Sequence, residues 1–176
     1  MKKIALLTGA MAGLFVLSGC QLFEKIFDPE KEYSYNDYKA LLAERDFKKP
    51  GYTKCISYGE SKSDSEEKSE TIEFTWDSTL NEWTNEKGTL FELTFMSNGI
   101  VREDVLNLTD ETAKDYTFYA KKKSYRITNK SKSDEGNVEW EWQYDEYGYI
   151  IKTYLKIVNL TELTTTEVTV KATYSK

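Results

Sequence analysis

Strict two-residue alternation near the C-terminus is the feature that most constrains how this chain folds. Between residues 138 and 144, Glu139, Glu141 and Gln143 alternate with apolar and aromatic side chains. The apolar set consists of Val138, Trp140, Trp142 and Tyr144. A period of two is that of a β-strand with one face on a core and the other in solvent. We therefore predict a half-buried strand in this segment.

Similar alternation continues through most of the chain after Gly51. Large apolar side chains alternate with polar ones at residues 72–76 and 91–95, and residues 163–174 form a long segment rich in Thr and Val. Asn98-Gly99 is a strong hairpin signal. Consecutive strands joined by short turns pair antiparallel. The repeated alternation therefore predicts an antiparallel sheet.

The remaining strands are predicted from shorter patterns. They lie at residues 52–58, 100–106, 116–121, 124–128 and 149–158. In the first of them the mixed pattern does not show which face, that of Cys55 or that of Ile56, is buried. The polar run at residues 61–69 predicts a solvated hairpin loop. In the last predicted strand the inward set is Val168, Val170, Ala172 and Tyr174.

Two segments have helical signals. Ser34 can cap a helix that continues to Phe47, and Pro50-Gly51 ends it. Leu108-Thr109-Asp110 combines an apolar residue with a cap, which predicts one or two helical turns to about Lys114.

These elements predict a mainly β (α+β) fold with one N-terminal helix and one short helix. One helix cannot cover both faces of eight or nine strands, so we expect a single antiparallel, strongly curved sheet or an incomplete barrel. The order of helix, hairpins, a Tyr144-Asp145-x-x-Gly148 turn and long final strands resembles the incomplete barrels of the lipoprotein-carrier and lipid-carrier lipoprotein families. That resemblance implies an architecture and no binding residues.

The N-terminus has the three parts of an export signal. Met1-Lys2-Lys3 is basic, residues 4–17 are largely apolar, and Leu17-Ser18-Gly19-Cys20 closes the run with small residues and one cysteine. The run is shorter than the 18 or so apolar residues of a spanning helix. Its end resembles the lipobox of bacterial lipoprotein precursors. The resemblance implies that Cys20 carries acyl chains such as palmitate and becomes the first residue. The alternative is an ordinary signal peptide cut near Gly19.

Three regions follow from this interpretation. We predict a signal peptide at residues 1–19, a lipid-anchored tether at residues 20–33 and one β-rich domain at residues 34–176. An apolar stripe within the tether either lies among lipid headgroups or packs on the domain. In a two-membrane bacterium the usual signal for retention in the inner membrane is an Asp directly after the cysteine. Gln21 stands there instead, which resembles the signal for the outer membrane. The expected location is therefore exported and membrane-anchored, at the cell surface or the outer membrane, on its periplasmic or extracellular face.

Composition narrows the chemistry. The sequence contains no histidine, which removes the commonest general base and zinc ligand. The predicted mature chain loses two lysines and no acids, which leaves 22 basic and 30 acidic residues and a net charge of −8. Such a charge argues against nucleic acid as a partner. Cys55 would be the one free thiol, and we expect it to be packed and inert. No motif indicates a metal site or a cofactor.

The aromatic residues are the candidate site. Trp76, Trp140, Trp142 and Tyr144 either form a platform for a sugar or lipid tail or fill the core. Glu139 and Glu141 have the spacing of a glycosidase pair, but they are expected on the solvated face opposite the tryptophans.

The sequence therefore favours a membrane-anchored cell-envelope lipoprotein that is not an enzyme. We expect its curved sheet to bind an apolar or amphipathic ligand, namely a lipid or a glycan, or an envelope protein. The alternatives are a structural or interaction module with a filled core and, third, an enzyme acting on carbohydrate.

Overall fold

The computed structural model describes residues 28–47, 50–80, 82–85 and 100–176. Contacts divide the chain into two units, residues 1–31 and 32–176, and the second contains the described helices and all but one residue of the sheet. The predicted signal peptide with Cys20, the strand at residues 91–95 and the hairpin at Asn98-Gly99 lie outside the described residues.

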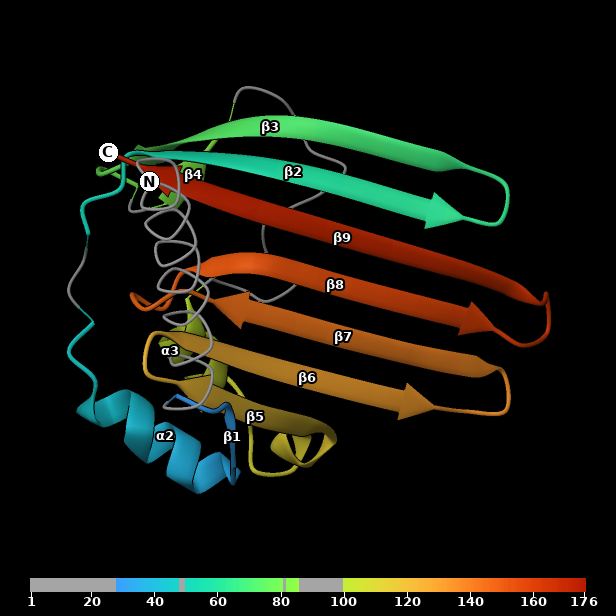
Figure 1. Ribbon diagram of the computed structural model, residues 1–176, viewed down its shortest axis with the longest axis horizontal. Coiled ribbons are helices and arrows are strands. Elements are labelled where there is room, and N and C mark those ends of the chain that lie inside the picture. Colours follow the sequence, from blue (N-terminus) through green and yellow to red (C-terminus); the bar gives the residue numbers. More distant parts are fainter. Residues whose placement is uncertain (1–27, 48–49, 81, 86–99) are drawn as a thin grey trace, which may run out of the picture. The chain divides into compact units, whose positions relative to one another are not determined.

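The domain is built on one antiparallel sheet of nine strands that does not close (Figure 1). The strands are β1 (Lys31–Tyr33), β2 (Lys54–Ser63), β3 (Glu67–Asp77), β4 (Glu82–Thr84), β5 (Tyr116–Lys121), β6 (Ser124–Lys132), β7 (Gly136–Tyr144), β8 (Ile150–Asn159) and β9 (Thr164–Ser175). Their order is β1-β5-β6-β7-β8-β9-β2-β3-β4. The predicted mainly β class, with an open antiparallel sheet and few helices, is confirmed.

The sheet joins two parts of the chain that are distant in sequence. β5 to β9 follow one another as a meander, and each pairs with the next. β9 then pairs along its length with β2, from Lys54 opposite Ser175 to Ser63 opposite Thr166. The hairpins of β2, β3 and β4 therefore extend the sheet beyond the final strand.

Helix α2 (Tyr35–Glu44) begins where the sequence predicted. The Ser34 side chain accepts a hydrogen bond from the backbone N–H of Asp37 at 3.2 Å, which satisfies one of the free donors of the first turn. Tyr38 and Leu42 form its buried face. A short 3-10 helix, η1 (Thr112–Asp115), follows a cap at Thr109, whose hydroxyl accepts from the Thr112 N–H at 3.1 Å.

The predicted strand at residues 100–106 is wrong, because this segment forms helix α3 (Val101–Leu106). Val101, Asp104 and Val105 are buried, and their i, i+3, i+4 spacing places them on one helical face. Alternation by two would instead place Asp104 beside Ile100 and Leu106. Only Ile100 keeps a strand contact, as an isolated bridge to Tyr149.

The predicted loop at residues 61–69 is also too long. β2 and β3 continue through most of it, with Lys62 opposite Glu67, and only residues 64–66 turn. This end of β2 is hydrogen-bonded to β3 on one side and β9 on the other. The polar composition therefore reflects exposed side chains on a paired strand.

The small side chains of β2 face inward. Cys55 and Ser57 are buried, whereas Ile56 is 46% and Tyr58 39% exposed. Cys55 lies opposite Phe74 on one neighbouring strand and Tyr174 on the other. At Cys55, the large side chains on both neighbouring strands leave room only for a small one between them.

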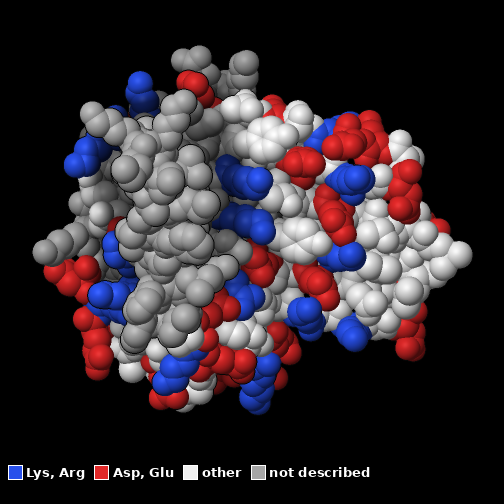
Figure 2. Space-filling model, in the orientation of Figure 1, with Lys and Arg blue, Asp and Glu red and all other residues white. Residues whose placement is uncertain are grey.

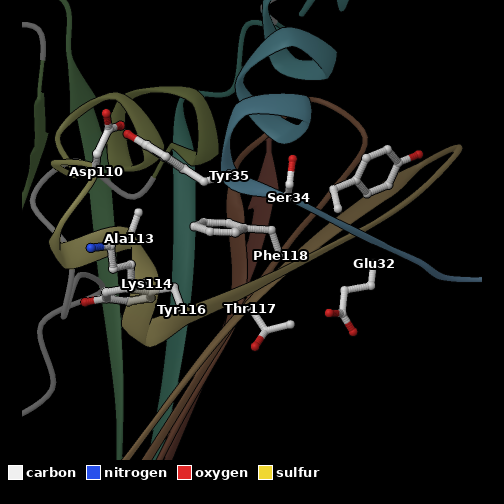
Figure 3. A pocket seen from close by; sticks show the side chains of 10 residues that line it. Glu32, Ser34, Tyr35, Asp110, Ala113, Lys114, Tyr116, Thr117 and Phe118 are labelled. Carbon is white, nitrogen blue, oxygen red and sulfur yellow. The ribbon is translucent and has the colours of Figure 1, made fainter.

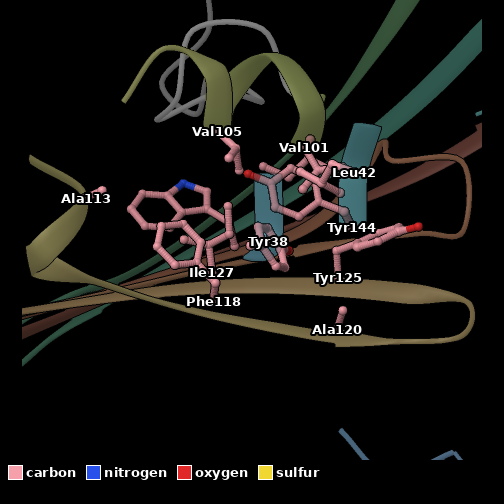
Figure 4. Packing of buried hydrophobic residues seen from close by; sticks show 12 residues of the cluster. Tyr38, Leu42, Val101, Val105, Ala113, Phe118, Ala120, Tyr125, Ile127 and Tyr144 are labelled. Atoms are coloured by element: carbon pink, nitrogen blue, oxygen red, sulfur yellow. The ribbon is translucent and has the colours of Figure 1, made fainter. Parts of the chain in front are cut away.

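Two buried clusters lie on the inward side. The large core takes residues from α2, α3, η1 and strands β5 to β8, and Figure 4 shows Val101 and Val105 of α3 directed toward the aromatic side chains of the sheet. Its buried members are Tyr38, Leu42, Val101, Val105, Ala113, Phe118, Ala120, Tyr125, Ile127, Trp142, Tyr144 and Ile150. The small core comes from strands alone, and its buried members are Cys55, Ile72, Phe74 and Ala172. Of the predicted inward residues of β9, Val170 and Ala172 are buried and Val168 and Tyr174 are half-buried.

The opposite face of the sheet is polar and carries a row of alternating charges. Across six neighbouring strands the registers align Lys130, Glu139, Lys156, Glu167, Lys62 and Glu67. Salt bridges join Lys130 to Glu139 at 3.1 Å and Lys156 to Glu167 at 2.8 Å. Figure 2 shows basic and acidic side chains interleaved across the surface turned to the viewer. We call this row the charge ladder.

Candidate ligand-binding site

Trp142 and Tyr144, two members of the predicted aromatic platform, lie in the large core. Their side chains are 3% and 0% exposed, and the Tyr144 hydroxyl donates a hydrogen bond to the buried Asp104 carboxylate at 3.0 Å. Trp140 is half-buried and stacks on Trp142, with 5.6 Å between ring centroids and 2° between planes. On this strand only Trp140 keeps an aromatic surface that a ligand could reach.

Trp76 lies elsewhere in the sheet. Three strands, β8, β9 and β2, separate its strand β3 from β7. Trp76 is half-buried and meets Trp83 of β4 edge-on, with ring centroids 5.4 Å apart. The four predicted platform residues therefore do not form one site.

A different aromatic group is assembled by the fold from five places in the chain. We call it the six-ring cluster, and it consists of Tyr52, Trp76, Trp83, Tyr147, Tyr149 and Tyr174. All six side chains are half-buried. Sequence reasoning found only Trp76, because the others come from loops, turns and strand ends where alternation is weak. The thirteen tyrosines of the chain were the one available signal.

Three tyrosines form the centre of the six-ring cluster. Tyr52 stacks on Tyr174 with centroids 5.3 Å apart, and Tyr149 lies 5.4 Å from Tyr52 and 5.3 Å from Tyr174. Tyr147 meets the edge of Tyr52 at 6.1 Å, and Trp83 lies 5.6 Å from Tyr174. The Tyr174 hydroxyl donates to the Ile150 carbonyl at 2.8 Å, which fixes this ring against the start of β8. The centre is therefore held by contacts on several sides.

Asp145 supports the cluster from the turn between β7 and β8. Its Oδ1 accepts hydrogen bonds from the backbone N–H groups of Tyr147 and Tyr149, each at 2.9 Å. Gly148 completes the turn with a φ of +82°, a conformation that favours glycine. Because a Cβ there would come within 3.0 Å of Val101, the turn also packs closely on α3. Both tyrosines are thus positioned by one side chain.

The electrostatic environment of the cluster is negative. Burial raises the pKa of Tyr174, Tyr149 and Tyr52, and the Asp145 carboxylate raises all three further. Burial likewise raises the pKa of Asp145 itself, although the backbone N–H groups oppose that effect. The phenols therefore stay protonated at neutral pH beside acidic groups.

A shallow pocket of about 280 Å³ lies between β1, the start of α2, η1 and β5 (Figure 3). Tyr33, Tyr35, Tyr116 and Phe118 supply its aromatic lining. The Tyr35 hydroxyl is already used, because it donates to the carbonyls of Val105 and Leu108. The pocket is open and mixed in polarity, with Glu32, Asp110 and Lys114 at its rim.

The three candidate catalytic groups of the sequence, Glu139, Glu141 and Cys55, are ion-paired or buried. Glu141 pairs with Arg126 at 3.3 Å, and both Glu139 and Glu141 lie on the polar face as predicted. Burial raises the pKa of Cys55 to about 12, so its thiol stays protonated, which supports the prediction that it is inert. In the described ranges no three His, Cys, Asp or Glu side chains are placed to hold a metal ion.

No family model, curated protein or solved structure matches this chain. Among the described residues, no helix is long and apolar enough to cross a membrane. The functional argument therefore depends on the residues of the chain itself.

Proposed function

We propose that this chain is an exported lipoprotein of the bacterial cell envelope, anchored through acyl chains on Cys20, whose β domain is a non-enzymatic binding module. Leu17-Ser18-Gly19-Cys20 supports the anchoring part. The observation that carries the binding part is the six-ring cluster, because six half-buried aromatic side chains at one end of an open sheet give a large surface that a ligand can reach.

The ligand binds on the surface of the domain in this proposal, and not inside it. Trp142 fills the large core, and Phe74 fills the separate small core. This packing favours the second candidate function, an interaction module with a filled core, over a carrier that encloses a lipid.

Anchoring keeps the binding surface close to the membrane. Eleven residues lie between Cys20 and Glu32, and an extended chain of that length spans at most about 40 Å. Two or more acyl chains hold a protein stably on a bilayer.

Metabolic labelling with a fatty-acid probe tests the anchoring. We expect the full-length protein to incorporate the probe and to sediment with membranes, and Cys20→Ser to abolish both. Cys55→Ser is the matched control, because it removes the other thiol and should leave labelling unchanged. Normal labelling of Cys20→Ser would contradict the proposal.

Native mass spectrometry of the full chain, released gently from its membrane, tests the binding. A bound small molecule that is lost in Tyr52→Leu would support a surface site at the six-ring cluster. A ligand retained in that variant would place the site elsewhere.

A further inference from the structure

The six-ring cluster combines aromatic side chains with nearby negative charge. Besides burial, carboxylates raise the pKa of the phenols at its centre: Asp145 acts on Tyr52, Tyr149 and Tyr174, Glu146 also acts on Tyr52, and Glu103 also acts on Tyr149. A ligand that rests on these rings therefore meets a field that favours positive charge.

Basic side chains of the domain lie over other rings. In the described part of the chain, Lys or Arg groups lie over Tyr35, Tyr119, Tyr125 and Tyr154, none of which belongs to the cluster. Glu146, one of the acids that act on Tyr52, is itself paired with Lys123 at 3.7 Å. Among the described residues, then, no basic side chain occupies the faces of the six rings.

The possible ligands differ in the hydrogen bonds that they need from the protein. A sugar needs several directional donors and acceptors, and at the centre of the cluster Asp145 Oδ1 already accepts two backbone N–H groups while the Tyr174 hydroxyl donates to the Ile150 carbonyl. A primary ammonium group has the same need, because it carries three N–H donors. A quaternary ammonium group has no donor to satisfy and is attracted to aromatic faces by their quadrupole.

We propose that the six-ring cluster binds a trimethylammonium group, either on a free small molecule or on a choline-type headgroup. Tyr52, Tyr149 and Tyr174 supply three half-buried rings in mutual contact, and Asp145 supplies the negative charge. The proposal deepens the binding function given above and does not depend on lipidation of Cys20.

Saturation-transfer NMR on the full chain in a nonionic detergent tests this directly, with choline as the probe. The control is 3,3-dimethylbutanol, which has the same shape and no charge. We expect choline to bind at least about tenfold more tightly than the alcohol, since the cation–π and carboxylate attractions act only on the cation. Equal binding of the two, or no saturation transfer to choline, would overturn the proposal.

Variants locate the site. Tyr52→Leu should weaken choline binding about tenfold, while Tyr52→Phe keeps the ring and should bind normally. Tyr154→Leu removes a half-buried tyrosine from the polar face and serves as the matched control. Asp145→Asn keeps the acceptor oxygen but removes the charge, and it should weaken choline without affecting the alcohol. Equal loss in Tyr52→Leu and Tyr154→Leu would contradict the assignment.

Glycerophosphocholine distinguishes the two sources of the group. Binding equal to that of choline supports a headgroup ligand, whereas weaker binding supports a free cation, because Asp145 and Glu146 repel the phosphate. Failure of all these cations would leave the test of Cys20 acylation unaffected, so the two proposals fail separately.

Discussion

The two cores differ in what covers them. The large core is enclosed by side chains from α2, α3 and η1 as well as from the sheet, whereas the small core has four buried residues contributed by strands alone. The strands of the small core also bury polar atoms without partners, namely the Ser57 hydroxyl and one carboxylate oxygen of Glu70, while the large core has one such atom, Trp142 Nε1. Less apolar burial and more unpaired polar atoms both lower local stability.

This difference indicates that one half of the domain is more stable than the other, and that the proposed binding surface lies between them. We expect the half of the sheet from β5 to β8 to supply most of the stability, because it carries the large core, and β2, β3 and β4 join it through the pairing of β2 with β9. The six-ring cluster lies where the two halves meet, because Trp83 and Tyr174 pack on the small core and Tyr147 and Tyr149 follow β7. The proposed binding surface therefore has Tyr147 and Tyr149 on the more stable half of the sheet, and Trp83 and Tyr174 on the half expected to open more easily.

The same substitution in each core gives the largest expected contrast. Phe118 is 2% exposed and Phe74 is 7% exposed, so changing either residue to alanine removes a buried aromatic ring. We expect Phe118→Ala to lower the free energy of unfolding by about 3–5 kcal/mol, and Phe74→Ala by about 1–2 kcal/mol less, because a less enclosed site collapses more easily. Urea unfolding measures both. Equal losses would remove the distinction between the cores.

Tyr144→Phe tests how α3 is held on the large core. The substitution keeps the ring and removes the hydrogen bond to the buried Asp104. We expect a loss of about 1–3 kcal/mol, since a buried carboxylate loses a donor. Tyr125→Phe is the matched control, because it also removes a phenol from the large core, and it should cost less in the same denaturation experiment.

Alkaline pH should act on the small core through Cys55. Its folded pKa of about 12 lies above the ordinary thiol value of 9.0, and the pKa of neighbouring Tyr174 is raised as well. The folded state therefore holds protons that the unfolded chain releases, and this contribution is full below pH 9 and falls as pH rises toward about 12. In Cys55→Ala the decline of unfolding free energy between these values should be shallower. An unchanged slope would show that the thiol does not contribute.

The charge ladder should give the smallest effect. Hydrogen bonding to Lys156 lowers the pKa of Glu167, so its contribution is present at neutral pH and is lost as pH falls through the folded pKa. Both side chains are exposed to solvent screening. Glu167→Gln should therefore destabilise slightly at neutral pH and low salt, and not at all in acid or high salt. Thermal unfolding across salt concentrations measures this.

Sequence patterning predicted the sheet better than it predicted the site. Alternation at residues 138–144 identified β7 and its buried face, because a strand period is a local property. The segment that contains Val101, Asp104 and Val105 was wrongly predicted as a strand, because six residues fit a helical or a strand period equally well. The helix is held by contacts such as the hydrogen bond from Tyr144 to Asp104, and Tyr144 is distant in sequence.

The six-ring cluster could not be predicted for the same reason. Tyr52 and Tyr174 are 122 positions apart, and they meet only because β9 pairs with β2. Alternation along the last strand marks Tyr174 as an inward residue but does not show that it meets Tyr52, so the topology of the sheet had to be known before the cluster could be recognised.

Native-state hydrogen exchange of the full chain tests the division of the domain most directly. We predict that amides in the centres of β6 and β7 exchange only through global unfolding, and that amides of β3 exchange through openings of lower free energy that are insensitive to dilute denaturant. Uniform protection across β3, β6 and β7, with one common dependence on denaturant, would contradict the account.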